Sequence, residues 1–125
     1  MNKFPVCPIF VPANKLDWVP KILASKADCI IFDLEDSILL SEKESSRSSL
    51  CDYLQSNALD ISVLIRINPL DTDIGKEDLA LFSRNVEIFD ALMLPKIEEP
   101  SVLDDMPKVD VCLLYTSPSP RDHQP

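Results

Sequence analysis

The chain has 125 residues, enough for one small domain, and 46% of them are hydrophobic, which is the composition of a folded protein. Its net charge of −9 argues against nucleic acid and anionic membranes as partners. There is no apolar run of about 18 residues to span a membrane, no visible secretory signal and no closely spaced cysteine pair, so we expect a cytoplasmic protein with reduced thiols.

Apolar runs of strand length alternate with helical patterns along the chain. The first run covers residues 6–11, and the helix that follows has Asp17 as its predicted N-cap and Pro20 in its first turn. The second run, residues 29–32, is flanked by charge and predicts a strand buried on both faces. Three acids come directly after it, so this stretch is the first candidate for chemistry.

A second helix is predicted over residues 41–56, with a capping box formed by Ser41 and Glu44. Its apolar stripe includes Leu50 and Leu54. Its charged residues are interpreted as a solvated face, and they are Glu42, Lys43, Glu44 and Arg47. The remaining elements are a strand at 61–68, a loop at 70–75, a short helix at 78–84, a strand at 91–94, a helical turn at 100–106 and the start of a strand at 109–111.

This alternation predicts an α/β fold with parallel strands and helices outside. Right-handed crossovers then bring the carboxyl ends of all strands to one edge, where α/β proteins build their sites. Polar residues follow three strands at that edge: Asp33, Glu35 and Asp36, then Arg66 and Asn68, then Lys96 and Glu98. Any one of these residues can be explained by the rule that a strand ends where the sequence becomes polar. The mixture of acidic and basic residues after three successive strands favours a functional site.

Four blocks of the sequence resemble the HpcH/HpaI aldolase and citrate lyase β-subunit family. They are FVPAN at 10–14, IFDLEDS at 31–37, IRINP at 65–69 and MLPKIE at 93–98, in the family's order and spacing. The resemblance covers about residues 4–111. It implies a TIM (β/α)8 barrel of about 250 residues, so we expect this chain to be its N-terminal half, truncated after four or five strands.

The resemblance also implies an activity. Family members are carbon–carbon lyases that use Mg²⁺ and act next to a carboxylate in 3-hydroxyacyl thioesters. A citryl or malyl thioester, carried on CoA or an acyl-carrier protein, would be cleaved to an oxo acid and an acetyl thioester. We expect a small-molecule substrate of this kind, and a homo-oligomer when the protein is full length.

Roles for individual residues follow from the same resemblance. Arg66 is expected to be catalytic and to bind the substrate carboxylate, with Asn68 and Lys96 as further substrate-binding residues. Asp33 and Glu35 are expected to be catalytic. The residues expected to support metal-bound water are Glu35, Asp36 and Glu98. The direct metal ligands, a Glu after strand five and an Asp after strand six, are expected beyond Val111.

Residues 112–122 resemble translated sequencing adapter. We therefore predict a partial barrel domain at 1–111 and a non-native tail at 112–125, and we expect the chain by itself to be inactive. Two alternatives stay open. One is a phospho-acceptor receiver module, with Asp33 as acceptor and Lys96 as its partner. The other is a remnant of the barrel that does not catalyse a reaction.

Overall fold

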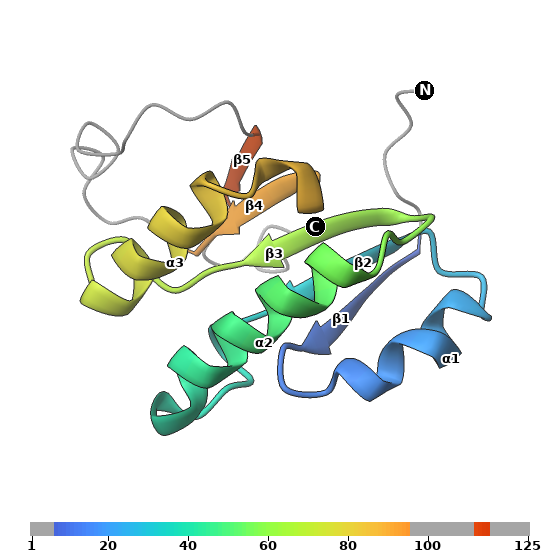
Figure 1. The fold of residues 1–125 in the computed structure, drawn as a ribbon, viewed down its shortest axis with the longest axis horizontal. Coiled ribbons are helices and arrows are strands. Elements are labelled where there is room, and N and C mark those ends of the chain that lie inside the picture. Colours follow the sequence, from blue (N-terminus) through green and yellow to red (C-terminus); the bar gives the residue numbers. More distant parts are fainter. Residues whose placement is uncertain (1–6, 96–111, 116–125) are drawn as a thin grey trace, which may run out of the picture.

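The structure, a computed structural model, describes residues 7–95 and the strand at 112–115, and it contains one five-stranded parallel sheet. The strands lie in sequence order: β1 (Pro8–Pro12), β2 (Cys29–Asp33), β3 (Ser62–Arg66), β4 (Ala91–Leu94) and β5 (Cys112–Tyr115). The helices are α1 (Val19–Leu23), α2 (Lys43–Ser56) and α3 (Asp73–Ser83), with single 3-10 turns η1 (Leu16–Trp18), η2 (Leu40–Glu42) and η3 (Val86–Ile88). Figure 1 shows the strands side by side.

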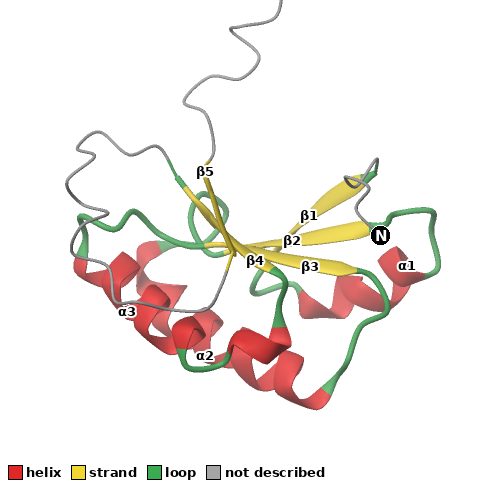
Figure 2. Ribbon diagram, turned by 90° about the horizontal axis from the view of Figure 1, so that it is seen from above, coloured by secondary structure: helices red, strands yellow, loops and turns green. Residues whose placement is uncertain are grey.

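The three α-helices all lie on one face of the sheet (Figure 2). Sequential parallel strands with helices on a single face are the arrangement of a (β/α) barrel segment. A receiver module has strand order 2-1-3-4-5 and helices on both faces, so the receiver alternative is wrong. The predicted parallel α/β architecture is confirmed.

The hydrophobic core lies between the sheet and these helices. Every residue of β2 is buried, which confirms the prediction that this strand is covered on both faces. In β3 the more buried side chains alternate with less buried ones, because one side chain in two points toward the helices. The core side chains that the sheet and the three helices contribute include Val11, Ile30, Phe32, Ile65, Leu92, Val19, Leu50, Leu79 and Phe82.

The helix starts differ from the sequence predictions. Asp17 lies within η1 and does not cap α1, although Pro20 does fall in the first turn of that helix. The capping box of Ser41 and Glu44 does not form, because Ser41 is part of η2 and α2 begins at Lys43 without a side-chain cap. A leading 3-10 turn satisfies the first amides instead.

Helix α3 begins at Asp73, five residues before the predicted start, so the predicted loop ends early. Thr72 is its N-cap and accepts a hydrogen bond of 3.0 Å from the amide of Gly75. A Cβ atom on Gly75 would lie 1.9 Å from the carbonyl oxygen of Pro69 and 2.6 Å from that of Asn68. Gly75 therefore lets α3 approach the loop that follows β3.

Several predicted features lie outside the described residues: Lys96, Glu98, the turn at 100–106 and the start of a strand at 109–111. Strand β5 pairs with β4 in parallel and consists of residues that we assigned to the tail. An apolar segment can add to an open sheet edge through main-chain hydrogen bonds whatever its origin, so the boundary at residue 111 stays a prediction. None of the described helices is long and apolar enough to cross a membrane.

Candidate active site

An arginine–carboxylate pair joins the ends of β2 and β3. The parallel register sets Asp33 directly beside Arg66. The guanidinium donates two hydrogen bonds to one carboxylate, from Nε to Oδ1 and from Nη2 to Oδ2, each 2.9 Å long. The amide of Leu34 then bonds to the carbonyl of Arg66 at 2.9 Å, which continues the strand pairing. This fork-to-fork geometry is the strongest arrangement available to an ion pair.

The carboxylate of Asp33 is buried and fully engaged. Besides Arg66 it accepts hydrogen bonds from the amide of Glu35 at 2.9 Å, the amide of Ser37 at 3.1 Å and the Ser37 hydroxyl at 2.7 Å. Burial by itself would raise the pKa of Asp33, but the hydrogen bonds from Arg66, Ser37 and Glu35 outweigh it and lower the pKa to about 2. Asp33 is therefore ionised at neutral pH and holds the acidic turn in place.

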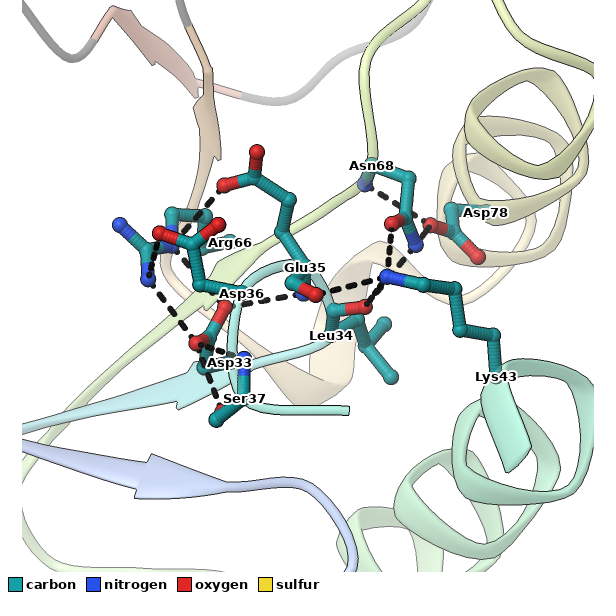
Figure 3. A network of polar contacts seen from close by, with 9 residues as sticks. All are labelled: Asp33, Leu34, Glu35, Asp36, Ser37, Lys43, Arg66, Asn68 and Asp78. Carbon is teal, nitrogen blue, oxygen red and sulfur yellow. Dashed lines mark hydrogen bonds and ion pairs between the residues drawn. The ribbon is translucent and has the colours of Figure 1, made fainter. Parts of the chain in front are cut away.

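Two further acids face the same guanidinium at longer range (Figure 3). The Glu35 carboxylate lies 3.6 Å from Nε of Arg66, and the Asp36 carboxylate lies 3.7 Å from Nη2. Burial, followed by the negative charge of Asp36, raises the pKa of Glu35. Three carboxylates thus surround one guanidinium, and negative charge is in excess at this edge of the sheet.

An aromatic ring also contacts Arg66. The guanidinium carbon lies 4.9 Å from the centre of the Phe10 ring, which is itself 46% exposed. The hydrogen bond to Asp33 raises the pKa of Arg66, so the charge is permanent. Among the described residues, Nη1 of Arg66 has no hydrogen-bond partner. Nη1 is therefore the guanidinium nitrogen that the described residues leave available as a donor.

A second polar network lies beside the first, on the helix side of the sheet (Figure 3). Asp78 of α3 accepts hydrogen bonds from the backbone and side-chain nitrogens of Asn68 at 2.9 and 2.7 Å, and from Nε of Arg47 at 2.8 Å. The Asn68 oxygen accepts a bond of 2.6 Å from Nζ of Lys43. Burial raises the pKa of Asp78, and the bonds from Asn68 and Arg47 offset part of that rise.

The prediction that Arg47 faces water is wrong, because Arg47 is only 8% exposed. Lys43 is half-buried rather than solvated, and neither Lys43 nor Asp78 was singled out from the sequence. One signal was present: Lys43 and Arg47 are four residues apart and so share a face of their helix. Nothing in the sequence alone says whether that face meets water or another helix.

The structure brings five of the predicted site residues to one edge: Asp33, Glu35, Asp36, Arg66 and Asn68. Asn68 is 3% exposed, and its side-chain nitrogen also donates to the Leu34 carbonyl at 3.0 Å. Both of its polar atoms are therefore engaged within the protein, and its binding of substrate stays a prediction. Lys96 and Glu98 are outside the described residues.

The described residues do not make a complete magnesium site. Among them, no group of three or more His, Cys, Asp or Glu side chains is arranged to hold a metal ion. The three acids after β2 are instead directed at Arg66. Mg²⁺ prefers oxygen ligands in octahedral geometry and keeps several of its waters. That these acids support metal-bound water stays a prediction.

Sequential parallel strands with helices on one face and a charged site at their carboxyl edge define a protein of the TIM-barrel type. The chain belongs to the HpcH/HpaI aldolase/citrate lyase family, whose family model matches residues 7–119. The family predicted from the four sequence blocks is thereby confirmed.

Curated relatives and solved structures agree with this assignment. The chain is 34% identical over 99 residues to citrate lyase subunit beta of Haemophilus influenzae, covering 78% of this chain and 33% of that protein. It is 30% identical over 93 residues to the mitochondrial citramalyl-CoA lyase of Rattus norvegicus, covering 74% of this chain and 28% of that protein. The chain thus spans about a third of these relatives.

A citrate lyase beta subunit from Mycobacterium tuberculosis, solved with oxaloacetate and magnesium, matches with a TM-score of 0.64 and 28% identity over 90% of this chain and 48% of that chain. The protein CitE from the same organism, solved with magnesium and acetate, matches with a TM-score of 0.66 and 26% identity over 90% of this chain and 45% of that chain. The predicted barrel class is confirmed by these neighbours.

Proposed function

We propose that the chain is part of a Mg²⁺-dependent carbon–carbon lyase that acts on a 3-hydroxyacyl thioester of the citryl or malyl type. The products would be an oxo acid and an acetyl thioester, carried on CoA or an acyl-carrier protein. The observation that carries the proposal is the Arg66 guanidinium, which Asp33 holds through Nε and Nη2 and whose Nη1 has no hydrogen-bond partner among the described residues. Relatives named citrate lyase and citramalyl-CoA lyase support it.

Arg66 would act on the oxo-acid half of the substrate. Its Nη1 donates to the substrate carboxylate, and its fixed charge stabilises the oxyanion that develops as the carbon–carbon bond breaks. Asp33 serves this step by fixing the plane and direction of the guanidinium, since both of its oxygens bind Arg66. Holding a charged donor in place before the reaction avoids the cost of reorganising water around the transition state.

Glu35 and Asp36 would orient metal-bound water by accepting its hydrogen bonds, and we propose Glu98 for the same task. A bound Mg²⁺ would supply Lewis-acid polarisation of the substrate oxygens. Its direct ligands would come from a Glu after strand five and an Asp after strand six, beyond Val111. Asn68 and Lys96 remain proposed substrate-binding residues, and the complete protein is proposed to be a cytoplasmic homo-oligomer.

The 125-residue chain by itself is proposed to be inactive, because its described residues lack a set of metal ligands. The test is an assay of oxo-acid release from citryl, malyl and citramalyl thioesters with Mg²⁺, on this chain and on the complete protein that contains it. We expect release only from the complete protein. Turnover by the short chain would contradict the proposed ligand positions. Thioester binding without turnover by the complete protein would instead support the non-catalytic alternative.

The role of Arg66 has its own test in the complete protein. Arg66→Lys keeps the charge but loses the two-pronged contact with Asp33, and we expect kcat/KM to fall about 10²-fold or more, as for the loss of an oxyanion donor. Arg84→Lys is the control, because Arg84 is exposed and caps the C-terminal end of α3, whereas the loop after β3 leads into the N-terminal end. An Arg66→Lys enzyme with unchanged kcat/KM would remove Arg66 from the mechanism.

A further inference from the structure

The side chain of Lys43, the first residue of α2, contacts the backbone of the acidic turn that follows β2 (Figure 3). Its Nζ donates to the carbonyl oxygen of Leu34 at 3.1 Å, to that of Glu35 at 2.6 Å and to the side-chain oxygen of Asn68 at 2.6 Å. An ammonium group has three protons, so all of its hydrogen-bonding capacity is used at this one place. A solvated surface lysine would hold no such fixed geometry.

Together with Asp33, these contacts restrain both backbone groups of Glu35. The amide of Glu35 donates to Asp33 at 2.9 Å, and the carbonyl of Glu35 accepts from Lys43. The peptide units before and after the Glu35 Cα are therefore both anchored. With the backbone fixed at both ends, the Glu35 side chain is directed to the guanidinium of Arg66, 3.6 Å away.

Lys43 is itself positioned by the buried helix network. Arg47 lies one helical turn further along α2 and binds Asp78 of α3 at 2.8 Å. Asp78 in turn binds Asn68, the third acceptor of Lys43. A continuous set of hydrogen bonds therefore runs from α3 through Asn68 and Lys43 to the backbone of Glu35.

We propose that Lys43 is a positioning residue of this site: it fixes the turn that carries Glu35 and places one positive charge behind the three acids. The importance for catalysis rests on the proposed function, whereas the geometric effect does not. The charged groups that face Glu35 are Asp33 and Asp36 of its own turn, Arg66 of β3 and Lys43 of α2. Burial and the two acids raise the pKa of Glu35, and Arg66 and Lys43 lower it.

The test is Lys43→Met in the 125-residue chain, followed by ¹³C NMR titration of the glutamate side-chain carboxylates. Methionine has a similar length but no charge and no donor. We expect the midpoint for Glu35 to move to higher pH. Lys76→Met is the matched control, because Lys76 is exposed on α3 and its loss changes the net charge equally. A lysine with a merely structural role would lower the thermal midpoint and leave the Glu35 titration unchanged, which would overturn the proposal.

A second measurement needs no substitution and applies if Lys43→Met does not fold. The ammonium protons of Lys43 should exchange slowly enough for detection in a ¹H–¹⁵N spectrum near neutral pH, with contacts to Leu34 and Asn68. The protons of Lys76 should be lost to exchange with water. Rapid exchange at Lys43 would overturn the proposal. Both measurements are independent of turnover, so a failed lyase assay counts against the proposed function and leaves the role of Lys43 standing.

Discussion

Two arginine–carboxylate pairs in this chain have bond lengths within 0.1 Å of each other and different surroundings. Arg66 binds Asp33 at 2.9 Å between neighbouring strands, and Arg47 binds Asp78 at 2.8 Å between neighbouring helices. The Arg47 side chain is 10% exposed and that of Asp78 is 1% exposed, whereas the Arg66 side chain is 19% exposed. Length alone does not separate a structural pair from a functional one.

The two arginines differ in how exposed they are and in how many acids face them. Nε of Arg47 binds Asp78, and Nη2 of Arg47 binds Glu77. The Asp78 carboxylate also accepts a hydrogen bond from the backbone amide of Asn68. The pair therefore acts as a cross-link between α2 and α3. Both arginines keep an Nη1 with no hydrogen-bond partner among the described residues. Arg66 is the more exposed of the two, and three acids face it where two face Arg47. Unbalanced charge that is held rigidly and remains accessible is typical of a site.

The largest effect is expected when the helix pair is broken. In Asp78→Ala, Arg47 loses its buried counter-charge and keeps only the exposed Glu77, and two nitrogens of Asn68 lose their acceptor. We expect the free energy of unfolding to fall by about 3–5 kcal/mol, measured by urea denaturation. Asp73→Ala, at an exposed position of the same helix, should change it by less than about 1 kcal/mol. A loss below about 1 kcal/mol in Asp78→Ala would mean that the pair is not a cross-link.

A smaller effect is expected from Gly75→Ala, which pushes α3 away from the loop that carries Asn68. The new methyl group would meet the Pro69 carbonyl, and backbone atoms cannot turn aside as a flexible side chain can. We expect a loss of about 3 kcal/mol in the free energy of unfolding, the upper end for overpacking. Lys76→Ala, the exposed neighbour, should have little effect. An increase of about 1 kcal/mol, the gain in helix propensity, would show that the close approach does not exist.

Lowering the pH should change the contributions of Asp33 and Asp78 to the free energy of unfolding in opposite directions. Asp33 has a folded pKa of about 2 against a model-peptide value of 3.8, so its stabilisation is complete above about pH 4 and is lost as the pH falls through 2. The difference between these two pKa values corresponds to about 2 kcal/mol in the free energy of unfolding. Burial raises the pKa of Asp78, so protonation in acid removes a cost at that residue instead.

The measurement compares urea unfolding of the chain and of Asp33→Asn at neutral pH and near pH 2. Asparagine cannot ionise, so the variant should be less stable than the unsubstituted chain at neutral pH and should lose less stability in acid. Asp52→Asn, on the exposed face of α2, serves as the control and should follow the unsubstituted chain. Equal acid sensitivity in Asp33→Asn and the unsubstituted chain would show that Asp33 does not supply this contribution.

The first pair could be predicted from sequence because parallel strands impose it. Once residues 29–32 and 61–68 are recognised as neighbouring strands, Asp33 and Arg66 must come together at the same edge. The second pair could not be predicted, because it depends on how two helices pack. A charged stripe on α2 has the same spacing whether it faces water or α3, and only the burial of Arg47 decides between them.

The helix starts were missed for a related reason. A capping box and a 3-10 turn both satisfy the first amides of a helix, and the choice depends on how the chain enters it. At η2 the entry follows the acidic turn, which is fixed by Lys43 and Asp33 rather than by Ser41. Contacts between residues that are distant in sequence therefore decide a local feature that the local sequence alone does not determine.

The smallest predicted effect concerns Phe10, the aromatic neighbour of Arg66. No ring stacks on Arg47 among the described residues, whereas Phe10 of β1 lies over the Arg66 guanidinium at 4.9 Å. Phe10→Leu keeps an apolar side chain but removes the ring face. Because Phe10 is 46% exposed, we expect a loss of only about 0.5–1 kcal/mol in the free energy of unfolding.

A double-mutant cycle can isolate this contribution. Phe10→Leu is measured in the unsubstituted chain and again in Arg66→Gln, where no cation remains for the ring to attract. A coupling energy of about 0.5–1 kcal/mol would show that the ring, as well as Asp33, restrains the guanidinium, so that Nη1 points away from both. Purely additive losses would mean that Asp33 alone orients Arg66. In that case Phe10 is an exposed apolar side chain at the sheet edge, and the two arginines differ only in exposure and in the number of acids around them.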